Sequence, residues 1–178
     1  MQTKLISDRS SILNFAPILF LRRNHGLEHA TLNILAEQEP NRRMAGYSDL
    51  GGFWIVGELT TGEVQSAVQE ALRRLKNGEY KLAVHPNCGT NFATAGILAG
   101  GVAAISMFGS GKRLKDNLER IPFAMTLATL AIIIAQPLGL RIQEKITTCG
   151  SMGSLAVISV EKREQGGFTL HRVATRAQ

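Results

Sequence analysis

The sequence predicts an α+β fold in which a two-helix transmembrane hairpin interrupts a small antiparallel sheet with flanking helices. Residues 91–108 and 121–140 carry no charged side chain. Short apolar runs bounded by glycine or proline lie on both sides of them, as expected for strands, and residues 64–75 have helical periodicity. We therefore expect three parts: an N-terminal α+β part with an interfacial helix (1–90), the transmembrane hairpin (91–140) and a C-terminal β-hairpin that completes the sheet (141–178).

Composition excludes several protein classes. Apolar residues make up 44% of the 178 residues and charged residues 19%, so a core can form and the chain is not disordered. Two cysteines are too few for a disulfide scaffold. A net charge of +6 suits a nucleic-acid binder or a membrane-surface protein. Because the basic residues occur as short pairs near apolar stretches, and no RNA-recognition or zinc-finger motif is present, we expect no nucleic-acid partner.

The first apolar run covers residues 12–21 and is followed by Arg22 and Arg23. A secretory signal would place its positive charge before the apolar run, and ten residues are too few to span a bilayer. We expect either a buried helix start or an interfacial helix, with arginines that meet lipid headgroups or solvent. A cytoplasmic polar domain is the default expectation.

The two uncharged segments are long enough to cross a membrane, since about twenty helical residues span the roughly 30 Å hydrocarbon core. The basic residues on the two sides balance, so the positive-inside rule does not orient the hairpin. We expect a multi-pass protein of the bacterial inner membrane. Gly96 and Gly100 form a G-x-x-x-G pattern that allows close helix packing. We expect this pattern to pack against small residues of the second segment, namely Ala124, Ala128, Ala131 and Ala135. The alternatives are packing in a homo-oligomer or in a larger membrane complex.

The polar parts contain a mixture of helices and strands. Residues 24–38 and 64–75 predict helices, the second preceded by a capping box of Thr60 and Glu63. A turn at Gly51–Gly52 precedes the first predicted strand. The four predicted strands, which come from both ends of the chain, are residues 53–59, 80–85, 154–161 and 168–175.

The candidate chemistry begins with His25-Gly26-Leu27-Glu28-His29, an H-x-x-E-H pattern. Residues four apart share one helix face, so both histidines can reach one metal ion. Glu28 could accept a proton from a metal-bound water. The alternative is a structural histidine cluster that is hydrogen-bonded to the backbone or to Glu28.

A second motif, at residues 85–91, reads HPNCGTN. His85 and Cys88 have a usable ligand spacing, and His85 is the preferred third ligand. Asp49 and Glu58 are weaker candidates. The motif also suits a plain turn in which Asn87 or Thr90 caps the following helix, and Cys88 could instead be a nucleophile with a histidine base.

Taken together, the motifs resemble a family of small bacterial membrane proteins of unknown function, associated with photosynthetic and related bacteria. The resemblance rests on four stretches, RRNHGLEHATLNIL, a central glycine-rich strand ending in GEL, LAVHPNCGTN and the C-terminal HRV. It covers nearly the whole chain and implies no activity. The H-x-x-E-H pattern is also similar to the inverted zincins, but over five residues only, and their downstream glutamate ligand has no counterpart that can be located here.

From these residues we expect a membrane-anchored metal-binding protein that could act as a zinc-dependent hydrolase near the membrane surface. Zinc would be held by His25, His29, His85 and Cys88, with Glu28 as the catalytic residue. Whether the protein is an enzyme stays open. The alternative is a non-catalytic accessory or assembly subunit of a larger photosynthetic or respiratory membrane complex.

Overall fold

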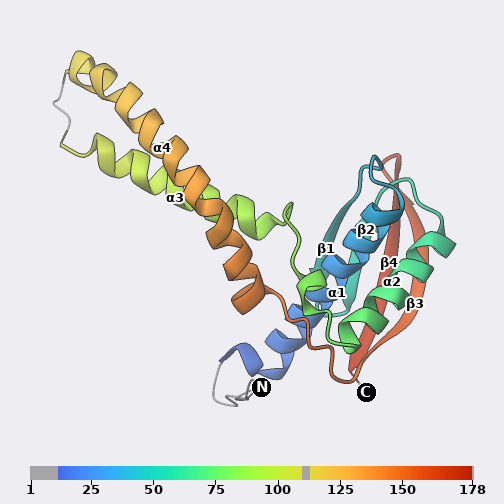
Figure 1. Cartoon of the computed structure of the whole chain (residues 1–178). Helices are drawn as coiled ribbons and strands as arrows, with labels where there is room; N and C mark the ends of the chain where they lie inside the picture. The colour runs from blue at the N-terminus through green and yellow to red at the C-terminus, as the bar shows by residue number, and fades with distance from the viewer. Residues whose placement is uncertain (1–11, 110–112, 178) are drawn as a thin grey trace. The chain divides into compact units, whose positions relative to one another are not determined.

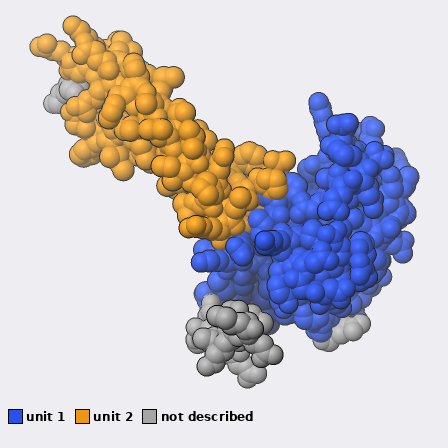
Figure 2. Space-filling model, in the orientation of Figure 1, with its two compact units in different colours: residues 1–85, 144–178 blue, residues 86–143 orange. Residues whose placement is uncertain are grey.

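The structure is a computed structural model that describes residues 12–109 and 113–177. It forms two compact units (Figure 2). Residues 1–85 and 144–178 make up the first, here called the globular unit, and residues 86–143 make up the second, here called the helical unit. The polar stretch at residues 1–9 and residues 110–112 of the predicted link lie outside the described residues.

The globular unit contains two long helices and four strands (Figure 1). The helices and strands are α1 (Ala16–Gln38), β1 (Ala45–Asp49), β2 (Gly52–Val56), α2 (Thr61–Lys76), β3 (Leu155–Gln165) and β4 (Phe168–Ala177). Short helical turns add η1 (Ile12–Asn14), η2 (Tyr80–Ala83) and η3 (Gln143–Thr147), the last of which begins on the final residue of the helical unit.

The four strands form one antiparallel sheet in the order β1-β2-β4-β3. The first two strands come from the N-terminal part of the chain and the last two from its C-terminal end, so the predicted α+β fold is confirmed. Helices α1 and α2 lie side by side on one face of the sheet (Figure 1). Side chains alternate between the faces of a strand, and those that point towards the helices, such as Phe53, Ile55 and Val173, are fully buried.

Helix α2 follows the sequence prediction closely. The Thr60 hydroxyl accepts from the backbone N–H of Glu63, and the Glu63 carboxylate accepts from that of Thr60, which completes the capping box. The predicted apolar face packs into the core, with Val64, Val68 and Leu75 fully buried. Burial of such side chains stabilises the fold by about 1.5–3 kcal/mol each.

One predicted strand was wrong, and one predicted helix is longer than expected. Residues 80–85 are not a strand, because η2 turns there and the carbonyls of residues 82–84 bond to side chains of α1 rather than to a neighbouring strand. The fourth strand is β1, a five-residue segment whose glycine and polar residues carry little strand propensity. The helices expected in residues 12–21 and 24–38 are one continuous helix, α1, which begins at Ala16; Pro17 fits its first turn, where a missing N–H costs nothing.

The helical unit consists of α3 (Gly89–Met107) and α4 (Leu114–Ile142). Among the described residues, two helical stretches are long and apolar enough to cross a membrane, Gly89–Met107 and Leu114–Thr147, with mean hydropathies of 1.3 and 1.9. The second therefore runs on through η3, past the predicted end at residue 140.

Packing inside the helical unit uses different small residues from those expected. Ala124, Ala131 and Ala135 of α4 are buried as predicted, and Gly139 lies so close to α3 that an added Cβ would stand 2.5 Å from the Asn91 amide oxygen. A Cβ added at Gly96 or Gly100 would instead meet open space among the described residues. The expected packing of these two glycines against α4 is therefore wrong.

Candidate metal centre

Three histidines of the globular unit gather on α1 and just after η2. His25 and His29 lie one turn apart on α1, with ring centroids separated by 4.3 Å and an angle of 62° between the ring planes. The ring centroid of His85 lies 5.8 Å from that of His29. We refer to these three residues as the histidine cluster. The predicted helix face therefore brings His25 and His29 together, and the chain after η2 adds His85.

Each of the two helix histidines is oriented by a backbone carbonyl. Nδ1 of His25 lies 3.0 Å from the Thr147 oxygen, and Nδ1 of His29 lies 2.9 Å from the Ala83 oxygen. Because a carbonyl oxygen can only accept, Nδ1 must carry the proton in both bonds. In the neutral ring Nε2 then has the lone pair, which is how metal-binding histidines are commonly fixed by their outer partners.

The two carbonyls belong to the two chain segments that connect the globular unit with the helical unit. Residues 82–85 lead into the helical unit and residues 144–151 lead out of it. Asn33 adds two bonds to the entry segment, at the Leu82 and Val84 oxygens (3.0 and 3.2 Å). Arg23 adds one to the exit segment, at the Ser151 oxygen (2.9 Å). Side chains of α1 thus hold both connections.

Gly26 lies between His25 and His29 on α1, and its lack of a side chain leaves room for both connecting segments to pack against the helix. A Cβ at this position would stand 2.5 Å from the Cys149 oxygen of the exit segment and 3.2 Å from the Ala83 Cβ of the entry segment. The first distance is a backbone clash that cannot be relieved by turning a side chain. The glycine of the H-G-x-E-H motif therefore has a packing role that the spacing of the motif does not indicate.

Arg22 was expected to meet lipid headgroups or solvent, and this expectation was wrong. Its guanidinium donates to the oxygens of Leu13, Lys145 and Thr148, at 3.2, 3.0 and 2.9 Å. These bonds join the short turn before α1 to the exit segment. Their partners lie up to 126 residues away along the chain, so no local sequence signal marks the role of Arg22.

Glu28 is 3% exposed, and its carboxylate accepts a hydrogen bond from the Ser48 hydroxyl of β1. It also lies against the neighbouring strand residue, since a Cβ at Gly46 would stand 2.6 Å from its Oε1. A buried carboxylate is costly unless it is hydrogen-bonded. The Ser48 bond therefore both stabilises Glu28 and joins α1 to the sheet edge.

Cys88 opens the helical unit and caps α3. Its Sγ accepts from the Thr90 backbone N–H at 3.4 Å, so the cap is Cys88 rather than Asn87 or Thr90. Cys88 lies three positions after His85 in the sequence, which limits the distance between their Cα atoms to about 11 Å.

Of the two weaker ligand candidates, Asp49 is paired with an arginine and Glu58 is exposed. The Asp49 carboxylate accepts two bonds from the Arg172 guanidinium, at 2.7 and 2.8 Å. These bonds hold the pKa of Asp49 below its ordinary value. Glu58 is exposed on the loop before α2. Neither residue takes part in the contacts that orient the histidine cluster.

The chain is similar to bacterial proteins that are themselves uncharacterised. An uncharacterised protein of Picosynechococcus sp. (strain ATCC 27264 / PCC 7002 / PR-6) is 34% identical over 180 residues, which cover 93% of this chain and 86% of the relative. No solved structure matches the chain. Residues 20–160 match the family model DUF6391, a domain of unknown function, and this range includes the histidine cluster and both apolar helices. The resemblance to an uncharacterised bacterial family is thereby confirmed, and the chain belongs to the DUF6391 family.

Proposed function

We propose that this protein is a membrane-anchored metal-binding protein whose histidine cluster holds a zinc ion. One observation carries the proposal: His25 and His29 adjoin on one helix face, and both direct Nδ1 to a backbone carbonyl. With Nδ1 as the donor in both bonds, Nε2 is the nitrogen through which each neutral ring would bind zinc.

The remaining ligands would come from the segment that enters the helical unit. His85 is the third candidate because its ring adjoins that of His29. Cys88 is the fourth, since it follows three residues later and a thiolate is a favoured zinc ligand. Four protein ligands would close the site and make it structural, whereas three would leave a position for water.

The metal would then stabilise the packing of the two connecting segments against α1. His25 and His29 already bond to the exit and entry segments through Nδ1. A zinc ion bound to the opposite nitrogens would fix both rings, and with them both connections. Binding energy of a structural zinc contributes directly to folding, so metal loss would destabilise the globular unit.

Membrane anchoring is supported by the surface of the helical unit. Its helices expose large apolar side chains, among them Ile97 and Ile105 of α3 (75% each) and Ile134 of α4 (64%). Such a surface is unfavourable in water and suits lipid. We propose a multi-pass arrangement in the bacterial inner membrane, with the globular unit on the cytoplasmic side.

A more specific version of this proposal gives the zinc site a hydrolytic role. Glu28 would assist a zinc-bound water, and its burial is the observation that favours it, because burial can shift a carboxyl group towards acid–base function. Its bond to Ser48 would have to break or be shared during such a step.

The alternative is a non-catalytic accessory or assembly subunit of a larger membrane complex, photosynthetic or respiratory. The open space at Gly96 and Gly100 favours it, because small residues on a lipid-facing helix surface allow a second helix to approach closely. The same surface would serve a homo-oligomer.

Metal analysis of the full-length protein in mild detergent tests the proposal. We expect about one zinc per chain for the wild type, with strong loss in His25→Ala and His29→Ala and retention in His171→Ala, which removes an imidazole outside the cluster. Zinc-free wild type, or equal zinc content in all three variants, would refute it. If zinc is present and Glu28→Gln leaves the activity on ester and peptide substrates unchanged, the site is structural.

A further inference from the structure

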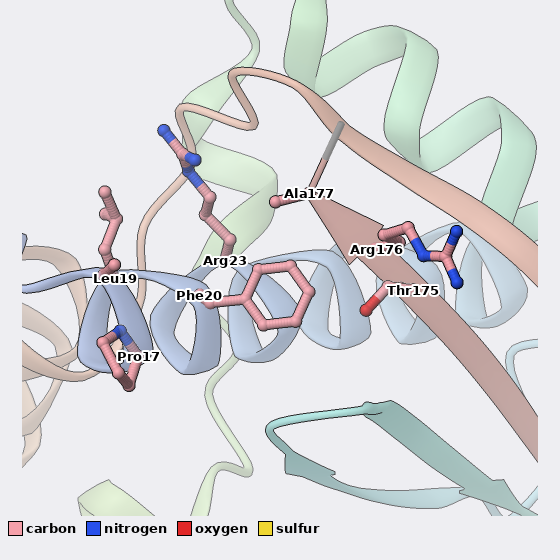
Figure 3. A pocket seen from close by; sticks show the side chains of 8 residues that line it. Pro17, Leu19, Phe20, Arg23, Thr175, Arg176 and Ala177 are labelled. Carbon is pink, nitrogen blue, oxygen red and sulfur yellow. The ribbon is translucent and has the colours of Figure 1, made fainter.

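A second feature of the globular unit lies away from the histidine cluster. A pocket of about 430 Å³ opens between the first turns of α1 and the end of β4 (Figure 3). Pro17, Leu19, Phe20 and Ala177 give it apolar walls, and Arg23 and Arg176 stand at its sides. Its volume lies in the range of about 300–1,000 Å³ that is typical of small-molecule sites.

The polar groups of the pocket favour an anionic ligand. Arg176 is exposed and Arg23 is half-buried, and neither forms a salt bridge with a carboxylate of the described residues. Arg23 uses Nε for the Ser151 oxygen. The Thr175 hydroxyl is already committed, because it donates to the Asn24 amide oxygen at 2.7 Å. Among the residues that the structure describes, the pocket therefore combines apolar walls with two positive charges that no carboxylate pairs with.

Arg22, the neighbour of the pocket residue Arg23 on α1, bonds to the segment with which the second membrane-length stretch ends. The bonded oxygens are those of Lys145 and Thr148, and the stretch ends at Thr147. On the other side of the pocket, Ile12 and Phe15 are 74% and 62% exposed just before α1. Exposed apolar side chains beside arginines are typical of a segment at the lipid–water interface.

We infer that this pocket binds one acyl chain of an anionic phospholipid, with the phosphate near Arg23 and Arg176. The inference rests on the membrane attachment proposed above and is independent of the metal. The apolar walls would take the chain by the hydrophobic effect, and the arginines would select a negative headgroup over a zwitterionic one. The bound lipid would hold the start of α1 against the bilayer.

Photolabelling localises the lipid. The full-length protein is placed in phosphatidylcholine nanodiscs that contain a small fraction of phosphatidylglycerol with a diazirine in its acyl chain, and labelled peptides are identified by mass spectrometry. We expect label at residues 16–23 and 175–177 as well as on α3 and α4. Diazirine-tailed phosphatidylcholine should label α3 and α4 only.

Two variants make the test specific. Arg176→Glu should reduce pocket labelling at least about fivefold, since one basic residue near an anionic headgroup contributes about that factor, and Ala177→Trp should reduce it by filling the space. Arg43→Glu, an exposed arginine elsewhere in the globular unit, makes the same charge change and should have no effect.

Several outcomes would overturn the inference. Equal pocket labelling by both lipids, or an unchanged signal in Arg176→Glu and Ala177→Trp, would leave only non-specific lipid contact. Labelling that arises only after residues 1–11 are removed would make the chain's own segment the occupant. Label on α3 and α4 without label at the pocket would reject the site and leave membrane attachment intact. Absence of label on α3 and α4 would reject both.

Discussion

The rings of His25 and His29 adjoin with centroids 4.3 Å apart, and they bond to opposite connections of the helical unit. His25 reaches the exit segment at Thr147 and His29 reaches the entry side at Ala83. Two adjacent side chains on one helix therefore link segments that are more than sixty residues apart. A single ion at their Nε2 atoms would therefore fix both connecting segments of the globular unit at once.

Gly26→Ala should destabilise the globular unit by roughly 1–3 kcal/mol, because the added Cβ meets the Cys149 oxygen at 2.5 Å and overpacking costs about that much. Urea unfolding of the full-length protein in detergent measures the change. Gly62→Ala is the matched control, since a Cβ there meets no neighbour within 4 Å. Equal stability of the two variants would show that the exit segment does not pack closely against α1 at Gly26.

The Asp49–Arg172 ion pair should make the free energy of unfolding depend on pH in the acidic range. Hydrogen bonds from Arg172 lower the pKa of Asp49, so the charged form favours the folded state. This contribution is present above the unfolded pKa of about 3.9 and is lost as the pH falls towards the lower folded value. Asp49 is 46% exposed, so solvent screening limits the effect to about 1 kcal/mol.

Asp49→Asn should therefore lower the free energy of unfolding at pH 7 and make little difference near pH 2. Exposed Glu58→Gln serves as the control. A deficit in Asp49→Asn that stays the same at both pH values would mean that the ion pair is not its source.

Mild acidification should lower the free energy of unfolding because of His171. It is fully buried, its Nδ1 has no partner among the described residues, and burial followed by the charge of Lys162 lowers its pKa. The folded state thus favours the neutral ring. Stability falls as the pH drops through the unfolded pKa of about 6.5 towards the folded value.

In His171→Leu the free energy of unfolding should depend less on pH between 7 and 5 than in the wild type. The difference between the two proteins isolates this residue from the other histidines. Parallel pH profiles would mean that His171 keeps the same proton affinity when the chain unfolds.

Two glycines of the helical unit should respond differently to leucine. Gly139→Leu should lower the thermal stability of the unit in detergent, because α3 leaves no room beside Asn91. Gly100→Leu should leave that stability unchanged, because its Cβ meets open space. If Gly100→Leu also reduces co-purification of a second copy or of a larger complex, the open glycine surface is the contact. A stable Gly139→Leu hairpin would contradict the close approach of α3 and α4.

Local patterns predicted several elements well. The apolar face and capping box of α2 depend only on residues within one turn of each other, and the two uncharged segments need no tertiary information. The pairing of His25 with His29 follows from helix geometry alone. These features are encoded over a few neighbouring residues, where propensity and spacing are informative.

Non-local contacts account for what the sequence did not reveal. The strand β1 is short and rich in small residues, and it forms because β2 pairs with it and Glu28 bonds to Ser48. The segment after α2 has strand-like composition, yet Asn33 and His29 take its carbonyls. The carbonyl partners of Arg22 and the tight fit of Gly26 likewise depend on chain segments brought together only by folding.

Zinc K-edge absorption of the zinc-loaded full-length protein tests the central claim most directly. We expect a four-coordinate site with imidazole nitrogens at about 2.0–2.1 Å, and a sulfur at about 2.3 Å that is lost in Cys88→Ser if that thiolate is the fourth ligand. His25→Ala and His29→Ala should remove the imidazole signal, and His171→Ala should keep it. A wild-type spectrum with oxygen ligands only, or spectra of His25→Ala and His29→Ala that are unchanged from the wild type, would contradict a metal centre at the histidine cluster.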